Sequence, residues 1–279
     1  KIQNLITSKN FSTAFVNCKK FLKKYPENSY ILNLSGLALQ GERKFSASIE
    51  YFYKALHYDT KNIAAMNNLA NSYKILFNYD KAQEIYLRII KEDPQNVKAL
   101  NNYANLKQTL NDFDGAIELY LIANKIAPNE LNILFSLAIS YQSIGNIEKS
   151  KEIADKILKI NPGKISVHKL ISGFTNYQKE NKEQFNVMKN LSKDNSLSDE
   201  QKIDLFYSLG KAYEDIKDFD MSFQYLEKAN MIKKKEVQYK IEKDEKVFNN
   251  IIKTFEEIDF SKFKKTSKEK KIIFICGMP

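Results

Sequence analysis

The 279-residue chain contains no tryptophan, and it has only eight glycines, five prolines and two cysteines. So little glycine argues against a turn-rich β protein and suits a helical one. The two cysteines, Cys18 and Cys276, provide neither a disulfide framework nor a metal-ligand spacing. The sequence also lacks a run of about 18 apolar residues, so we expect no transmembrane segment. What the chain has in quantity is aromatic residues, 18 Phe and 16 Tyr, which are ample for a stacked helical core.

Positive charge exceeds negative charge by 10, and this excess is uneven. Residues 228–271 hold 14 lysines against 8 acidic residues. An anionic partner or a solvated lysine-rich helix would explain this stretch, and the interleaved acidic residues favour the solvated helix. We expect no nucleic-acid partner, because neither an aromatic–basic RNA motif nor a zinc-finger spacing is present. His57 and His168 have no catalytic partner pattern nearby, so we expect structural roles for both, with no catalytic or metal site.

A pattern of 34 residues occurs twice in tandem between residues 63 and 130. Its apolar residues fall at steps of three and four, which places them on one face of each of two helices. A fixed period of this length, mixing small and large apolar residues, indicates a helical repeat array. The recurring positions in the first copy are Met66, Leu69, Ala70, Tyr73, Tyr79, Ala82, Tyr86, Ile89 and Pro94, and in the second copy Leu100, Tyr103, Ala104, Lys107, Phe113, Ala116, Tyr120, Ala123 and Pro128.

This pattern resembles the tetratricopeptide repeat (TPR). The resemblance implies an all-α fold, a right-handed α-solenoid in which neighbouring helix pairs stack because one pair cannot bury both of its faces. We expect the small residues Gly36, Ala70, Ala104 and Ala138 to be buried where helices cross. The predicted organisation is a partial repeat at 1–28 and a TPR array at 29–236, with copies near 29–62, 63–96, 97–130, 131–164, a degenerate one at 165–202 and a last one at 203–236.

Beyond the array, apolar spacing predicts one long connecting helix at 237–260, which we expect to cap the last repeat. A lysine-rich linker follows at 261–271, and then the apolar run IIFIC at 272–276, closed by Gly277, Met278 and Pro279. Such a run is typical of a buried parallel strand. We therefore expect a short C-terminal strand that begins a truncated α/β domain, with the glycine turn starting a phosphate-binding loop.

Three stretches together are similar to bacterial TPR-containing sulfotransferases: SLGKAYED at 208–215, YLEKAN at 225–230 and IFICGMP at 273–279. The resemblance implies that Gly277, Met278 and Pro279 begin the loop that holds 3′-phosphoadenosine-5′-phosphosulfate (PAPS). It also implies sulfuryl transfer to an acceptor hydroxyl, which in some relatives belongs to a protein tyrosine. The remaining loop and catalytic residues would follow residue 279, so we expect residues 1–279 alone neither to bind PAPS tightly nor to transfer sulfate.

Two alternatives to the sulfotransferase stay open. The same strand and glycine would also begin a Walker loop, which would make the lost domain a P-loop kinase or NTPase. The chain could instead be a stand-alone TPR adaptor that binds peptides. We expect a cytoplasmic protein, and an upstream segment because the first residue is lysine rather than methionine.

Asparagines recur opposite the apolar stripe on the first helix of two copies. Amides donate and accept hydrogen bonds at once, so a ladder of them can hold the backbone of an extended peptide. We predict a protein or peptide partner in this groove, with Asn68, Asn71, Asn102 and Asn105 on one continuous concave surface. The predicted groove residues are Asn67, Asn68, Asn71, Asn101, Asn102 and Asn105.

Overall fold

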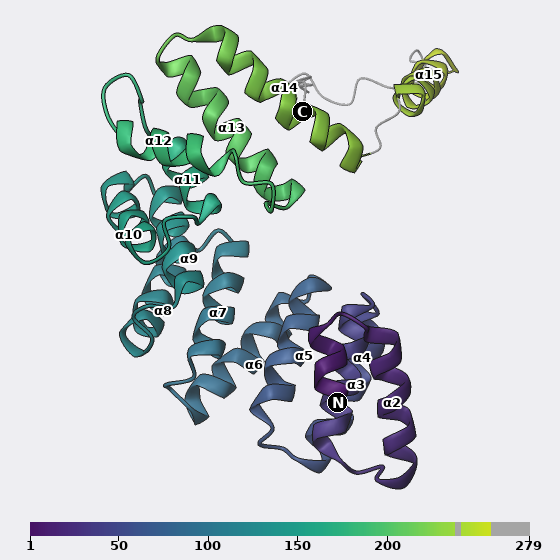
Figure 1. Cartoon of the computed structure of the whole chain (residues 1–279). Helices are drawn as coiled ribbons and strands as arrows, with labels where there is room; N and C mark the ends of the chain where they lie inside the picture. Colours follow the sequence, from purple (N-terminus) through teal and green to yellow (C-terminus); the bar gives the residue numbers. More distant parts are fainter. Residues whose placement is uncertain (238–240, 258–279) are drawn as a thin grey trace, which may run out of the picture.

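A computed structural model describes residues 1–237 and 241–257, and all of the regular structure in these ranges is helical (Figure 1). The described part therefore agrees with the predicted all-α fold. Its helices are α1 (Ile2–Thr7), α2 (Phe11–Lys24), α3 (Ser29–Gly41), α4 (Phe45–Tyr58), α5 (Ile63–Ile75), α6 (Tyr79–Glu92), α7 (Val97–Thr109), α8 (Phe113–Ile126), α9 (Leu131–Ser143), α10 (Ile147–Ile160), α11 (Ile165–Ser172), α12 (Lys182–Leu191), α13 (Asp199–Asp215), α14 (Phe219–Val237) and α15 (Ile241–Glu257).

The first helices of three consecutive pairs each begin after an asparagine. Asn28, Asn62 and Asn96 each accept a hydrogen bond at 2.9 Å through Oδ1 from a backbone N–H three residues later. Asparagine is among the best N-terminal caps because it satisfies a helix N–H that has no partner within the helix. The three caps are one repeat apart, so the same residue fixes where α3, α5 and α7 start.

Each pair then reverses direction at a residue with left-handed backbone. The φ angle is 61° at Arg43, 60° at Phe77 and 60° at Asn111, and only the fourth equivalent, Gly145 with φ 77°, is a glycine. A left-handed conformation costs an ordinary L-residue roughly 1–2 kcal/mol. The packing of the two antiparallel helices against each other must offset this cost at the first three turns.

Small residues lie where the helices of a pair cross. Ala70, Ala104 and Ala138 have no exposed surface, and Gly36 is also buried, which confirms the sequence prediction. A Cβ atom built on Gly36 would lie 2.3 Å from the Phe52 ring, so no larger residue fits without moving that ring. The close approach of α3 and α4 thus depends on glycine at this position.

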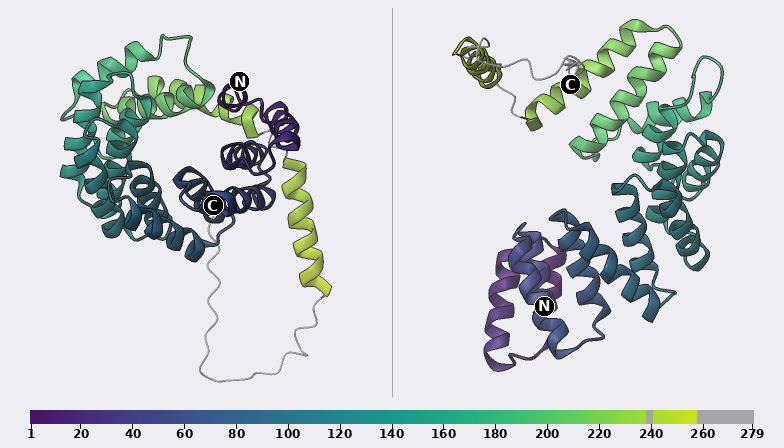
Figure 2. Two further views of the ribbon diagram at one scale, coloured as in Figure 1. Left: turned by 90° about the horizontal axis from the view of Figure 1, so that it is seen from below. Right: turned by 180° about the vertical axis from the view of Figure 1, so that it is seen from behind.

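The array curves because its two layers of helices pack differently. The first helices α3, α5, α7 and α9 contact one another in succession, whereas second helices of neighbouring repeats approach one another less closely in the described part. The layer with the closer spacing must lie on the inside of the curve. Figure 2 shows the described helices curling through most of a turn. We call the inner layer the first-helix face.

Regularity is lost at the predicted degenerate segment. The helices α11 and α12 are short, with 8 and 10 residues. A buried tyrosine holds their connection: the Tyr177 hydroxyl lies 2.8 Å from Ser172 Oγ and 2.9 Å from Gln184 Oε1, and the Tyr177 N–H donates to Asp215 Oδ2 at 3.0 Å. These bonds connect α11 and α12 to α13.

The helix after the array differs from the prediction. The last array helix continues to Val237, and α15 is a separate helix whose apolar side chains are between 47% and 63% exposed. Two phenylalanines of the last repeat, Phe219 and Phe223, are also exposed. Apart from Phe255, the apolar side chains of α15 and these two phenylalanines are largely exposed, so the described residues give no support to the expectation that this helix caps the array.

The predicted strand at 272–276 and the loop residues Gly277, Met278 and Pro279 lie outside the described residues, as does the linker at 261–271. Among the helices that are described, none is both long and apolar enough to cross a membrane. The described residues also contain no group of three or more His, Cys, Asp or Glu side chains placed to hold a metal ion.

Candidate functional site

The predicted asparagine ladder lies on α5 and α7, in the first-helix face. Asn67 and Asn68 are only 2% and 8% exposed, whereas Asn71 is half-buried. On α7, Asn101, Asn102 and Asn105 are likewise half-buried. Two of the three ladder asparagines on α5 are therefore nearly closed to solvent, and a ligand has better access to the other four side chains of the ladder.

The buried amides bond to neighbouring repeats. Asn68 Nδ2 donates to Asn33 Oδ1 at 2.9 Å, and Asn102 Nδ2 donates to Asn67 Oδ1 at 3.5 Å. These bonds connect α3 to α5 and α5 to α7. For Asn67 and Asn68 the expectation of free, groove-lining amides is corrected: their first role is to join consecutive first helices, because a buried amide without partners would be costly.

Glutamines form a second set of connections that the sequence reasoning missed. Gln40 Nε2 donates to the Asn68 carbonyl at 2.8 Å and to Ser72 Oγ at 2.7 Å. Two repeats further on, Gln108 Nε2 donates to the Ser136 carbonyl at 3.1 Å and to Ser140 Oγ at 2.6 Å. The signal was present in the sequence, because glutamine and serine both recur at the same spacing of two repeats.

The junction between α5 and α7 lies between the two that glutamine bridges, and it has a lysine in place of the glutamine. Lys74 on α5 is half-buried, and its ammonium group makes no hydrogen bond or ion pair with any residue that the structure describes. The residue opposite, which is Ser72 or Ser140 at the bridged junctions, is here Leu106. Burial lowers the pKa of Lys74 from its usual value. A cation that has lost water and gained no partner favours a ligand with negative charge.

Two buried oxygens also lack partners, one beside Lys74 and one on α7. The Tyr86 hydroxyl and Asn101 Oδ1 have none in the described structure. In the next repeat the equivalent hydroxyl, on Tyr120, lies 2.6 Å from Asn105 Oδ1 and 2.9 Å from Gln108 Oε1. The side chain equivalent to Gln108 is Lys74, which has no acceptor atom. The Tyr86 hydroxyl thus lacks one of the two acceptors that the Tyr120 hydroxyl has.

The combination on the first-helix face is a half-buried cation with neighbouring amides that are not fully bonded. Asn71 forms no side-chain hydrogen bond within the described residues. Amides can bond to a peptide backbone, and the ammonium of Lys74 can bond to a carboxylate.

Comparison with known families supports the repeat assignment. A tetratricopeptide repeat profile matches residues 63–96, 131–164 and 203–236, and a second tetratricopeptide repeat profile matches residues 85–118. The chain carries TPR repeats. A comparison with curated proteins finds no match.

The TPR matches also locate the irregular part of the array. The second matched segment starts 68 residues after the first, which is two periods of 34, whereas the third starts 72 residues after the second. The four additional residues fall in the region of α11 and α12. The last repeat is therefore out of the 34-residue register by four residues, and these residues lie where the helices are short.

Solved TPR structures share the fold. A tetratricopeptide repeat protein from Parabacteroides merdae aligns with a TM-score of 0.61 and 18% identity, over 83% of this chain and 90% of that one. The pilF protein of Pseudomonas aeruginosa also aligns with a TM-score of 0.61 and 18% identity, over 80% of this chain and 98% of that one. At this identity the likeness concerns the fold alone.

Proposed function

We propose that this chain is a peptide-binding TPR module whose first-helix face holds an extended segment of a partner protein. The observation that carries the proposal is Lys74, a half-buried ammonium without a partner at the middle junction of the array. It would bind a carboxylate of the peptide, either the C-terminus or an acidic side chain. Asn71, Asn101 and Asn105 would bond to the peptide backbone, which makes binding depend little on sequence beyond the anionic group.

Selection from a library of short displayed peptides tests this function directly. Peptides recovered on the full chain should bind at least tenfold more weakly, a loss of about 1.4 kcal/mol, to the Lys74→Gln variant. Asn71→Ala should also weaken binding, without loss of helical circular dichroism, because Asn71 forms no side-chain bond within the described array. Lys125→Gln, at an exposed position on the second helix α8, is the matched control and should leave affinity unchanged.

Equal affinity of wild type and Lys74→Gln for every selected peptide would contradict the proposal. So would recovery of peptides without any carboxylate near the contact. The same assay on variants of Asn67 and Asn68 is less useful, because their loss would disturb the junctions between repeats.

The sulfotransferase interpretation remains a prediction that depends on residues 272–279, which lie outside the described structure. A stand-alone TPR adaptor fits at least as well, since it requires only the repeats. Calorimetry with 3′-phosphoadenosine-5′-phosphate distinguishes the two when a form extending past Pro279 is compared with residues 1–279. Binding by the longer form alone supports the sulfotransferase; binding of ATP instead supports the P-loop alternative, and binding of neither supports the adaptor.

A further inference from the structure

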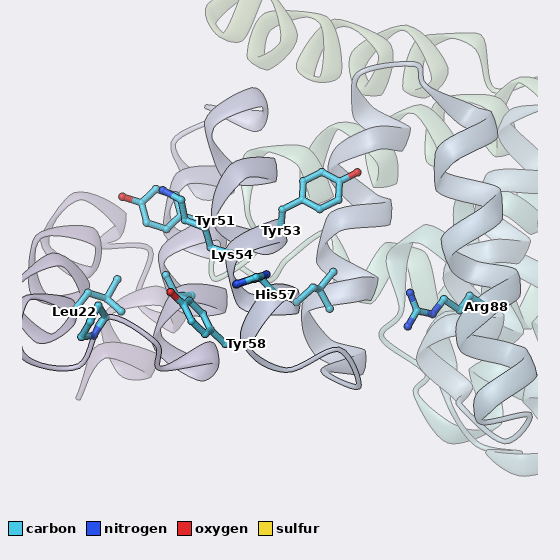
Figure 3. A pocket seen from close by; sticks show the side chains of 10 residues that line it. Leu22, Tyr51, Tyr53, Lys54, His57, Tyr58 and Arg88 are labelled. Carbon is cyan, nitrogen blue, oxygen red and sulfur yellow. The ribbon is translucent and has the colours of Figure 1, made fainter.

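A second, chemically different surface lies on the outer side of the first repeats. There, a cavity of about 900 Å³ opens between the second helices α2, α4 and α6. In Figure 3, α4 contributes Tyr51, Tyr53, Lys54, His57 and Tyr58 to its wall. We call this cavity the outer pocket. It exists because the array curves: the first helices pack closely on the inside, so the second helices spread apart on the outside.

The outer pocket has an apolar base and aromatic sides. Leu22, Leu32 and Leu56 lie among the residues that form it. Two of its tyrosines are open to solvent, Tyr53 with 50% and Tyr58 with 47% exposure. Exposed aromatic rings around an apolar hollow are the features that most often anchor a partner side chain.

Cations border one side of the outer pocket. Lys54 Nζ lies 5.4 Å from the centre of the Tyr51 ring, and the Tyr51 ring meets Phe15 edge-to-face at 5.5 Å. On α2, Lys19 Nζ lies 4.9 Å from the centre of the Phe15 ring. These four side chains form a continuous row across α2 and α4, with two rings in the middle and a cation at each end. The rings hold both ammonium groups at the surface beside the pocket.

The residues that line the outer pocket include basic side chains and no acidic ones, although Glu50 and Glu84 lie near its Tyr51 and Tyr53. The pocket is lined by Lys54, His57 and Arg88 and by no aspartate or glutamate. Residues 1–26 add six lysines and contain no acidic residue. Arg88 is already engaged, since it pairs with Glu92 at 3.2 Å and donates to the Thr60 carbonyl at 3.3 Å.

Helix dipoles do not account for this excess. The carboxyl ends of α2 and α4 each carry about half a negative charge, which together would balance about one lysine. The four lysines of α2 are all exposed and have no ion pair in the described structure. An excess of several positive charges is therefore left to face solvent or a ligand.

We infer that the outer pocket docks an acidic segment of a partner protein that also carries an aromatic or large aliphatic side chain. That side chain fills the apolar hollow next to Leu56 and Tyr58, and flanking carboxylates meet Lys54 and the lysines of α2. A protein segment fits better than nucleic acid, because the hollow is apolar and the Tyr51 ring already contacts Phe15. Residues 261–271 of this chain do not fit, because their lysines carry the same sign of charge.

A subtractive selection tests the inference. A displayed peptide library is bound to the full-length chain, and peptides that also bind the Lys54→Glu/Tyr58→Ser variant are removed. Both substituted residues are exposed, so the variant should keep the wild-type circular dichroism spectrum. We expect the remaining peptides to combine acidic residues with Phe, Tyr or Leu, and to bind the variant at least tenfold more weakly than wild type.

Matched variants separate this site from the first-helix face. Lys74→Gln should leave these peptides bound, and Lys125→Glu, the same charge change on a distant helix, should have little effect. Loss of binding in Lys74→Gln would place the peptides on the first-helix face and overturn the inference while supporting the proposed function.

Other ligands are tested on the same proteins. Tighter binding to polyuridylate or to phosphatidylserine vesicles than to the selected peptides, lost in the Lys54→Glu/Tyr58→Ser variant, would overturn the inference. Self-association of the wild-type protein that the Lys54→Glu/Tyr58→Ser variant abolishes would also overturn the inference. The same holds if no peptide binds wild type more tightly than this variant.

Discussion

The junction between α7 and α9 is bridged by Gln108, whereas the junction between α5 and α7 has Lys74 at the same position of the repeat. Around Gln108 the polar groups are bonded: the amide reaches Ser136 and Ser140, and the Tyr120 hydroxyl has its acceptors. Around Lys74 the ammonium group and the Tyr86 hydroxyl have no partner in the described structure. Two copies of one helical pattern therefore differ at one position: Gln108 bonds to the next repeat, whereas Lys74 does not and is the residue that we propose binds a ligand.

The largest expected effect concerns what the two junctions share. Ala70 and Ala104 are both fully buried where helices cross, so leucine at either position should lower the free energy of unfolding by about 1–3 kcal/mol through overpacking. Urea unfolding followed by circular dichroism measures this change. Ala64→Leu, at an exposed position of α5, is the control and should stay within about 0.5 kcal/mol. A neutral Ala104→Leu would show that the crossing is not closely packed.

The next prediction addresses the difference between the junctions. Gln108→Ala removes two hydrogen bonds to α9 and should lower the free energy of unfolding by about 1–2 kcal/mol. Lys74→Ala removes none within the described residues, so its effect should be within about 0.5 kcal/mol. If urea unfolding gave equal losses for both variants, the contrast between the junctions would be refuted.

The two tyrosines should respond in opposite directions. Tyr120→Phe removes a bonded hydroxyl and should destabilise the protein by about 0.5–1.5 kcal/mol. Tyr86→Phe removes a buried hydroxyl that has no partner, so it should be neutral or should stabilise the protein by up to about 1 kcal/mol. Thermal and urea unfolding of the two single variants would decide, and a clear loss in Tyr86→Phe would indicate a partner such as bound water.

Alkaline titration tests the buried tyrosine of the bonded junction. Burial raises the pKa of Tyr120 to about 12, whereas a tyrosine in the unfolded chain titrates near 10. Above that lower value the unfolded chain releases protons that the folded chain keeps, so stability falls as pH rises between about 10 and 12. The fall in the urea midpoint should be shallower in Tyr120→Phe than in wild type. Identical pH profiles would mean that Tyr120 does not titrate as a buried group.

Much of the fold was predictable because repeat periodicity is a local property. The spacing of apolar residues at three and four, the small residue at 70 or 104 and the proline at 94 each specify helix position through nearest neighbours. The asparagine caps repeat in the same register. The sequence was less informative at α15. The apolar stripe of this helix correctly indicates a helix but does not indicate what covers the stripe.

The candidate sites were predicted less well. The asparagines were placed on the correct helices, but Asn67 and Asn68 are buried in bonds between repeats, and the glutamine bridges and Lys74 were not recognised. A hydrogen bond between successive first helices joins residues about 28 to 35 positions apart. Whether an amide faces solvent or a neighbour depends on the rise and rotation between repeats, which no single repeat encodes.

The sequence by itself determined that this chain is a stack of helix pairs, because period, caps and turns act within about one repeat. Only the tertiary structure decided which layer lies inside the curve and where the outer pocket opens between α2, α4 and α6. It also decided that Lys74 is half-buried without a partner while Gln108 is bonded. The physical reason is that burial and hydrogen-bond partnership are properties of pairs of repeats, and they exist only once the repeats are stacked.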